Sequence, residues 1–503
     1  MTDGRAGEAP GAGTGTDLAR SAARGAATTT AARAVRIVVQ IAGLVVLARL
    51  LTPEDYGLVA IVGTLAGVAE LLRDFGLSNA AIQAPVVTAA QRSNLHWVNL
   101  GLGVLFAGAM VALAEPIADA FGNRDLVGVV RWMAVVVVLN SWATQYRAAL
   151  SRDLRFTALA TLEIVSLVVG TALAVVLAWQ GWGYWALVAM QLLTAAVMCV
   201  GSTLQGGWWP QRFRRGVPLR SFLRFGSQVF AAQLLGYASR NVDTIVAGLR
   251  FGVPASGLYN RAFQLMAMPI TQLTYPAGKV ALPVLSRLQD DDARFERYLL
   301  RGQTVLLHAL LPIVALVCAL PEQIIDIALG PTWSQAAPIL QILALGAFFE
   351  AANFSPSWVL QATGATGMLL RYTLVAKPLM IVLIVAGSQL GLEGIALGYA
   401  VGAALTWPLG LLWVRRVRAA TARHLFLNGA VAVSGHIAIA ACVAGVVRVL
   451  APDSAWTALV VGAGTLAVVT ALLALVWPAW RRGVLSLLWT VQLARARAGR
   501  PAR

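Results

Sequence analysis

The chain has 503 residues, of which 58% are hydrophobic and only 12% are charged. A soluble domain carries about a quarter charged residues, so this composition excludes a water-soluble protein. The apolar residues also come in blocks of about twenty, the length that crosses a bilayer core. A net charge of +17 would suggest a nucleic-acid partner in a soluble protein. Here the arginines fall mostly between the apolar blocks, so we expect no nucleic acid.

Fourteen apolar spans can be drawn along the chain, with edges good to a few residues. They are 29–51, 56–73, 94–114, 126–146, 158–178, 184–205, 223–248, 255–276, 302–320, 335–354, 369–389, 394–414, 427–449 and 456–477. Residues 1–28, rich in Gly, Ala and Thr, predict a disordered cytosolic tail rather than a signal peptide.

The loops between these spans alternate in charge. Odd-numbered loops are nearly free of basic residues, as in Pro53-Glu54-Asp55, whereas even-numbered loops are rich in arginine, as in the segment 212–220. Since basic loops stay in the cytosol, this pattern predicts that both termini are cytosolic. We expect the basic tail 481–503 to rest on the headgroups of membrane lipids.

An internal repeat relates the two halves of the chain. Residues 33–69 align without gaps to residues 233–269, and Gly57-Leu58 then matches Gly257-Leu258. Parallel repeats of this kind are typical of transporters, with the substrate path between them. The sequence therefore predicts an all-α polytopic membrane protein of about 14 transmembrane helices, in two six-helix lobes plus two C-terminal helices. The expected units are a tail 1–28, an N-lobe 29–222, a C-lobe 223–420, spans thirteen and fourteen in 421–480, and a tail 481–503.

Polar residues form stripes on three of the spans. An ionisable residue inside a span is costly and usually faces a cavity or a partner. Arginine binds phosphate oxygens through its planar fork and stays charged, so we interpret the stripes as a cationic cavity for an anionic head group. Snorkelling of Arg33, or reach of Arg240 to the outer interface, is the alternative. The candidate residues are Arg33, Arg36 and Gln40 in span one, Gln233, Tyr237 and Arg240 in span seven, and Asn260, Arg261 and Gln264 in span eight.

Four further charged residues are candidates for a gate or for ion coupling. They are Asp243, Glu70, Arg73 and Glu163. Asp243 is close enough in sequence to pair with Arg240, whereas a gate and simple anchoring at the interface both explain the other three.

Other chemistry finds no support in the sequence. The three cysteines and four histidines lack ligand spacing, so we expect no metal. Asp290-Asp291-Asp292 precedes a basic segment, and we interpret it as a helix cap rather than a metal-diphosphate motif. No nucleotide-binding loop, dinucleotide fingerprint or nucleophile elbow is present, so we expect no cofactor and no enzymatic activity.

Short segments along residues 30–415 together resemble polysaccharide flippases of the Wzx/WzxC type, in the multidrug/oligosaccharidyl-lipid/polysaccharide exporter superfamily. One is the stretch from Ala48 to Leu58, and others are Phe75-Gly76-Leu77-Ser78, Gly257-Leu258-Tyr259-Asn260-Arg261 and Gly330-Pro331-Thr332-Trp333. The resemblance implies a two-lobed alternating-access exporter in the bacterial inner membrane. It implies undecaprenyl-diphosphate-linked oligosaccharide units as substrate, a cation gradient as driving force, and a polysaccharide polymerase and co-polymerase as partners.

Three other classes of protein remain as alternatives. An ion-coupled multidrug or metabolite exporter would share the fold but would need an acidic or apolar cavity, against which the arginine stripes argue. A membrane glycosyltransferase, polymerase or ligase would need a sizeable outer loop with acidic or histidine chemistry, and the outer loops are short. A purely structural scaffold explains neither the repeat nor the arginines inside the spans.

Overall fold

The computed structural model describes residues 35–84 and 86–487, and every regular element in those residues is a helix. The first described helix covers residues 35–50, and a last helical segment covers residues 478–487. The others are α2 (Pro53–Asp74), α3 (Leu77–Gln83), α4 (Ala89–Ala112), α5 (Ala114–Phe121), α6 (Asp125–Arg152), α7 (Phe156–Trp179), α8 (Tyr184–Gly206), α9 (Arg220–Phe251), α10 (Val253–Arg287), α11 (Asp292–Ala319), α12 (Pro321–Ala328), α13 (Ala336–Ala352), α14 (Phe354–Ala362), α15 (Thr366–Gly387), α16 (Leu392–Arg415), α17 (Ala419–Leu450) and α18 (Ala455–Val476), with two short 3-10 turns, η1 (Pro331–Trp333) and η2 (Ser388–Leu390).

Each predicted span coincides with one of the long helices, which confirms an all-α polytopic membrane protein. Among the described residues, eleven helical segments are long and apolar enough to cross a bilayer. Helices α9 and α10, which carry two of the three predicted polar stripes, are outside this set, and only sixteen residues of the first helix are described. The count of fourteen spans therefore stays a prediction. The predicted tail 1–28 and most of the tail 481–503 lie outside the described residues.

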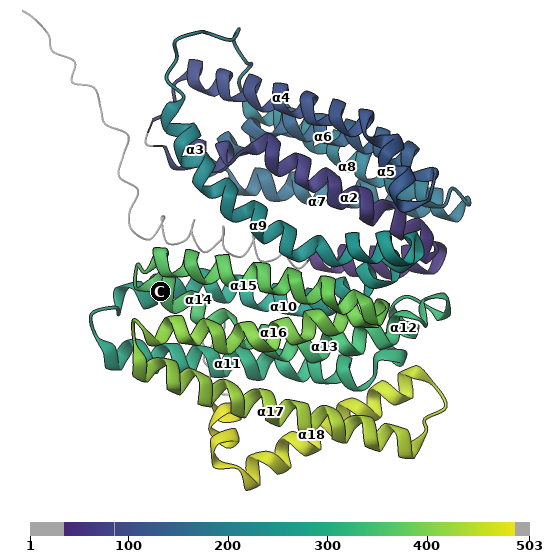
Figure 1. Ribbon diagram of the computed structural model, residues 1–503, viewed down its shortest axis with the longest axis vertical. Helices are drawn as coiled ribbons and strands as arrows, with labels where there is room; N and C mark the ends of the chain where they lie inside the picture. The colour runs from purple at the N-terminus through teal and green to yellow at the C-terminus, as the bar shows by residue number, and fades with distance from the viewer. Residues whose placement is uncertain (1–34, 85, 488–503) are drawn as a thin grey trace, which may run out of the picture.

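Two bundles lie one above the other in Figure 1. We call the bundle of α2, α4, α6, α7 and α8 the N-lobe, and the bundle of α10, α11, α13, α15 and α16 the C-lobe. Helix α9 lies between them, because it packs on α2 and α3 on one side and on α10 and α15 on the other. Helices α17 and α18 cover the face of the C-lobe that is turned away from the N-lobe (Figure 1).

The two lobes meet through a reciprocal backbone contact between α2 and α10. A Cβ atom on Gly57 would lie 2.0 Å from the carbonyl oxygen of Val253, and one on Gly257 would lie 1.8 Å from that of Pro53. Only glycine allows so close an approach. The four positions are related by an offset of 200 residues, as two repeated lobes require at a shared axis. Nearby, the indole nitrogen of Trp333 donates a hydrogen bond of 2.8 Å to the Ala48 carbonyl, so this end of the molecule is sealed.

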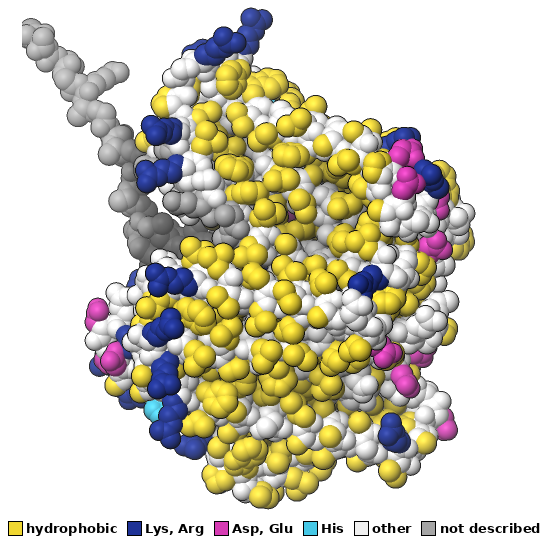
Figure 2. All heavy atoms as spheres, in the orientation of Figure 1, with side chains coloured by type: hydrophobic (Ala, Val, Ile, Leu, Met, Phe, Trp, Pro, Cys, Tyr) yellow, Lys and Arg dark blue, Asp and Glu magenta, His cyan; other side chains and the backbone are white. Residues whose placement is uncertain are grey.

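Charges gather at the two ends of the helices. Figure 2 shows most of the visible lysine and arginine side chains along one edge, and most of the acidic side chains along the opposite edge, near α5 and α12. The basic edge is the end at which the predicted even-numbered loops lie.

Ion pairs near the helix ends join neighbouring segments, and one lies within the start of α11, between Asp291 and Arg294. Glu115 pairs with Arg124 at 2.8 Å in the acidic edge of the N-lobe. Beside the C-lobe, Asp292 pairs with Arg418, which precedes α17. The carboxylate of Asp291 accepts a hydrogen bond from the backbone N–H of Arg294 at the start of α11, which confirms the interpretation of the Asp290–Asp292 segment as a helix cap.

Candidate functional site

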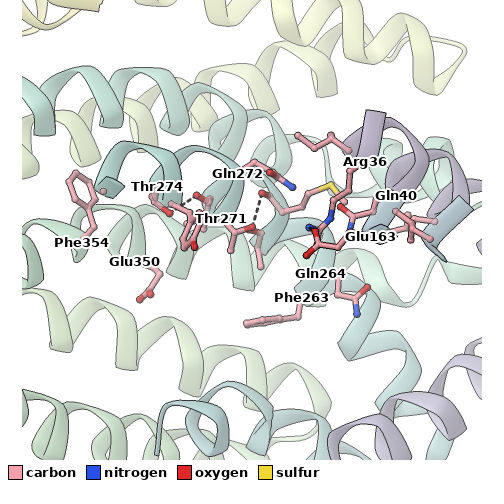
Figure 3. Close-up of a pocket in the computed structure, with 18 of the residues that line it drawn as sticks. Arg36, Gln40, Glu163, Phe263, Gln264, Thr271, Gln272, Thr274, Glu350 and Phe354 are labelled. Atoms are coloured by element: carbon pink, nitrogen blue, oxygen red, sulfur yellow. Dashed lines mark hydrogen bonds and ion pairs between the residues drawn. The ribbon is translucent and has the colours of Figure 1, made fainter. Parts of the chain in front are cut away.

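A cavity of about 1540 Å³ lies between the two lobes. Residues of the first helix, α2, α7 and α8 line it on one side, and residues of α10, α13, α14 and α15 line it on the other. The lining begins at Tyr56 and Arg261, beside the sealed end, and continues along α10 to Lys279 near the basic end. Figure 3 shows Arg36 and Glu163 at one side of the cavity and Glu350 and Phe354 at the other, with α10 between them.

Five of the residues predicted from the sequence line this cavity: Arg36, Gln40, Glu163, Arg261 and Gln264. Arg36 and Glu163 point toward one another (Figure 3), and their side chains form an ion pair of 2.9 Å that joins the first helix to α7. Both side chains are still partly exposed, by 49% and 38%. A pair this exposed contributes little to stability, so the Arg36 guanidinium is available to an anion that enters the cavity.

Arg261 is the cation closest to the sealed end of the cavity. Its guanidinium lies over the ring of Tyr56, with 3.9 Å from its carbon to the ring centroid. Its Nε atom is buried and has no hydrogen-bond partner, and none of the ion pairs between described residues includes Arg261. Removing a guanidinium from water without a counter-charge is costly. The arrangement is therefore suited to an anion that the ligand brings.

The remaining candidates of the stripes lie elsewhere. Arg33 is outside the described residues, and Gln233, Tyr237, Arg240 and Asn260 are not among the residues that line the cavity. The Tyr237 hydroxyl donates a hydrogen bond of 3.0 Å to the Thr64 carbonyl and packs on Gly67, so it joins α9 to α2. Asn260 accepts a hydrogen bond of 3.0 Å from the Gln264 amide.

No described side chain of α9 is among those that line the cavity, and α9 packs on α2, α3, α10 and α15. Helical spacing identifies which residues share a face, but it does not identify the neighbour of that face. Arg240 is exposed, and among the described residues it forms no ion pair with Asp243.

Three gate candidates also lie outside the cavity lining. Asp243 is buried, and its carboxylate accepts a hydrogen bond of 2.7 Å from the backbone N–H of Thr244. Arg73 is buried and donates to the Asn140 carbonyl at 3.2 Å, while Glu70 accepts from the Asn140 amide. Glu70 and Arg73 thus join α2 to α6 within the N-lobe.

Several residues of the C-lobe that line the cavity are not among the residues predicted from the sequence. They are polar or aromatic side chains from α10, α14 and α15, among them Thr271, Tyr275, Trp358, Gln361, Thr373 and the two lysines Lys279 and Lys377. Neutral polar residues and aromatics are common in membrane helices, so no local pattern distinguishes them. The lysines had a signal, because lysine occurs nowhere else in the chain.

Known proteins are similar to this chain in sequence and in fold. The model of a family described as "Polysaccharide biosynthesis protein" matches residues 46–338, more than half of the chain. The lipopolysaccharide biosynthesis protein WzxC of Escherichia coli (strain K12) is 24% identical over 363 residues, which are 71% of this chain and 73% of WzxC.

Two solved structures share the fold. The lipid II flippase MurJ in an inward closed conformation superposes with a TM-score of 0.69 over 88% of this chain and 98% of MurJ, at 12% identity. A multidrug resistance MATE family transporter in an inward-facing conformation gives 0.62 over 76% of this chain and 95% of that one, at 16% identity. At such identities the structures show only that the fold is shared with these two proteins. With its apolar helices, the chain is a multi-pass protein of the inner membrane. The resemblance to WzxC-type flippases seen in the sequence is confirmed, and the chain belongs to the polysaccharide biosynthesis protein family.

Proposed function

We propose that this protein is a flippase that moves undecaprenyl-diphosphate-linked oligosaccharide units from the cytosolic to the outer leaflet, where they are polymerised into an exported polysaccharide. Three findings support the proposal: the family to which the chain belongs, its similarity to WzxC, and a fold shared with the lipid II flippase MurJ. A polysaccharide polymerase and co-polymerase would act next, as its partners. The protein itself makes and breaks no covalent bond in this proposal.

The observation that carries the proposal is the unpaired guanidinium of Arg261 inside a cavity between two lobes. A diphosphate supplies the missing counter-charge and the oxygen acceptors that a planar guanidinium binds in pairs. Arg36 adds a second cation on the opposite wall, and its ion pair with Glu163 is exposed enough to exchange for a phosphate. The lining also includes two carboxylates, Glu163 and Glu350, but its four cations outnumber them, whereas a cavity for cationic drugs would have the opposite balance or an apolar wall.

The arrangement of charges supports an inward-facing state. Positive-inside topology assigns the basic edge of Figure 2 to the cytosol, and the end sealed by Gly57 and Gly257 to the outside. The cavity then receives its ligand from the cytosolic leaflet. Transport requires the glycine contact to separate while the lobes close at the basic end, which is alternating access between two states.

A cation gradient is the driving force in this proposal. Asp243 is a buried carboxylate on α9, beside the lobe interface, and among the described residues it has no basic partner. A buried carboxylate binds a proton or a small cation more readily than it stays bare. Occupancy of Asp243 by a cation would differ between the two states and would bias their equilibrium.

The test is the location of lipid-linked glycan in a deletion strain that is complemented with variants. Wild-type protein restores glycan on the outer face and polysaccharide outside the cell. Arg261→Gln is expected to leave full-length units on the cytosolic face. The matched control is Arg250→Gln, an exposed arginine near the end of α9 that does not line the cavity. All variants are quantified in membranes so that loss of protein is not read as loss of transport.

Two outcomes would overturn the flippase. Units that still reach the outer face in the deletion strain, without being polymerised, would indicate a role in polymerisation. An unchanged glycan pool together with raised sensitivity to drugs would indicate a multidrug exporter. Arg240→Ala in the same assay decides whether the stripe on α9 belongs to the substrate path, since retained export would remove it.

A further inference from the structure

Lysine is almost absent from this chain, yet both of its lysines line the cavity. Of 39 basic residues only Lys279 and Lys377 are lysines, and arginine is used at every other position. Fewer than a tenth of the residues line the cavity. The two lysines come from different helices, α10 and α15, so one local feature of the sequence does not account for both.

The two lysines differ in their surroundings, and Lys377 is placed where a charge is costly. Lys377 is the twelfth residue of α15, a helix long and apolar enough to cross the bilayer, and its side chain is half-buried. Lys279 is exposed on α10, with its Nζ atom 4.7 Å from the ring centroid of Tyr275. No ion pair between described residues includes either lysine. An ammonium at the depth of Lys377 indicates a functional site with an anionic partner. Lys279 adds a second, accessible ammonium to the same cavity.

The lysines are too far from Arg261 to share its anion. Lys279 and Arg261 are eighteen residues apart on α10, which corresponds to about 27 Å along a helix. Counted from the basic end, Lys279 and Lys377 lie at similar depths, roughly 12 and 17 Å into their helices. A single diphosphate bound at Arg261 therefore cannot reach them, and a second anionic group is needed.

The wall around the lysines has the chemistry of a sugar-binding surface. Gln361 and Thr373 offer hydrogen-bonding groups, and Trp358 and Phe354 form an aromatic pair with ring centroids 4.5 Å apart. Aromatic faces and neutral polar groups suit sugars, which present both C–H faces and hydroxyl groups. The opposite wall is mainly aliphatic, with residues such as Ile37, Leu44, Ile164, Leu167 and Met190.

We infer that the C-lobe wall of the cavity is a glycan subsite that selects acidic oligosaccharides, in which Lys279 and Lys377 bind sugar carboxylates. The inference rests on the proposed function, because it assigns the second half of the same substrate. A lysine ammonium is a point charge on a flexible stem, and it follows a carboxylate on a mobile glycan without fixing its plane. In this assignment Arg261 binds the diphosphate, whereas Lys279 and Lys377 bind the acidic sugars.

The experiment measures binding of two separate probes to the purified full-length protein in zwitterionic lipid nanodiscs. One probe is a phosphate-free oligomer of glucuronic acid, with a neutral glucose oligomer of the same length for comparison. The other is inorganic pyrophosphate. The variants are Lys279→Gln, the double variant Lys279→Gln/Lys377→Gln, the charge-preserving Lys279→Arg/Lys377→Arg, and Arg261→Gln.

We expect the double glutamine variant to bind the acidic oligomer about tenfold more weakly or worse, which is the scale of one lost charged contact. The double arginine variant should stay within about threefold of wild type, and the exposed Lys279→Gln alone should show part of the loss. Pyrophosphate affinity should be unchanged in all three lysine variants and reduced in Arg261→Gln.

Three results would overturn the subsite. The first is that the wild-type protein binds acidic and neutral oligomers equally, or binds neither. The second is that the double glutamine variant binds the acidic oligomer as well as wild type does, and the third is that replacing the lysines abolishes pyrophosphate binding. A failure of the proposed function looks different, because Arg261→Gln would then bind pyrophosphate like wild type whatever the lysines do.

Discussion

Glu163 neutralises one of the cations that line the cavity. Its ion pair with Arg36 is partly exposed, and such pairs contribute at most about 1 kcal/mol. An anionic head group that binds Arg36 has to displace this carboxylate. Glu163→Gln should therefore raise the affinity for pyrophosphate by up to about fivefold and leave the melting temperature nearly unchanged. Titration of the purified variant measures both, and weaker binding would show that Glu163 positions Arg36 instead of competing for it.

Gly57 offers a second test at the level of one atom. A methyl group there would meet the Val253 carbonyl at 2.0 Å, so α2 and α10 would have to separate at the sealed end. Gly57→Ala should abolish export and should open the cavity to a membrane-impermeant thiol reagent from outside, detected at Thr271→Cys in a background without native cysteines.

The control for Gly57→Ala is Gly63→Ala on the same helix, where an added Cβ would meet nothing within 4 Å. It should export normally and keep Thr271→Cys protected from outside. Normal export by Gly57→Ala would mean that the glycine contact is not part of the outer seal.

The sequence predicts only part of the cavity lining. Arg36, Gln40, Arg261 and Gln264 could be found because a charged or amide side chain inside an apolar span has few alternatives to a cavity. The sequence does not predict which neighbours surround the polar face of α9, because the helix periodicity is the same whether Arg240 faces the cavity or another surface. In three dimensions α9 packs on α2, α3, α10 and α15, and Arg240 is exposed but not among the residues that line the cavity.

Among the helices, hydropathy predicted the long ones and missed the short ones. Helices α3, α5, α12 and α14 have seven to nine residues each, too few to appear as a block of bilayer length. Helix α10 shows the converse, because it carries much of the cavity lining and is not apolar enough to count among the candidate membrane spans. A helix that lines a polar path is necessarily less apolar than one that faces lipid.

The helical segment 478–487, which follows α18, packs against α11 of the C-lobe and against α17. Its Trp480 is fully buried, with ring centroids 5.0 Å from His308 of α11 and 4.7 Å from His436 of α17. The ring packs on Gly435, where a Cβ would be 2.1 Å away.

Trp480→Ala should therefore destabilise the packing of α17 on α11, by about 3 kcal/mol or more if the site behaves like a protein core. Thermal unfolding of the purified variant measures this loss as a lower melting temperature. The matched control is Trp456→Ala, whose side chain is 64% exposed at the other end of α18. Equal melting temperatures for the two variants would show that this segment contributes no stability.

At the scale of the whole molecule, charge predicts how the protein is inserted. The alternation of basic and acidic loops seen in the sequence becomes two opposite edges in three dimensions (Figure 2). Single cysteines in a background without native cysteines test the orientation. Asp326→Cys, near the acidic edge, should react with an impermeant maleimide on intact cells. Asp290→Cys, in the loop between α10 and α11, should react only after the cells are permeabilised. The reverse pattern would mean that the protein has the opposite orientation in the membrane and that the cavity opens to the outside.

The ion pairs described above, between Arg36 and Glu163, Arg124 and Glu115, and Arg418 and Asp292, each join helices on one side of the cavity. Among the described residues no ion pair joins the two lobes. They meet through glycine backbone, the Trp333 indole, and contacts of two arginines with uncharged groups: Arg261 with the Tyr56 ring and Arg49 with the Ile327 carbonyl. Dissolved salt weakens attraction between opposite charges and has less effect on such contacts. The balance between the two states of the empty protein should therefore be nearly independent of ionic strength. Any salt dependence of transport then reports on how the anionic substrate is captured, and it separates that step from the movement of the lobes.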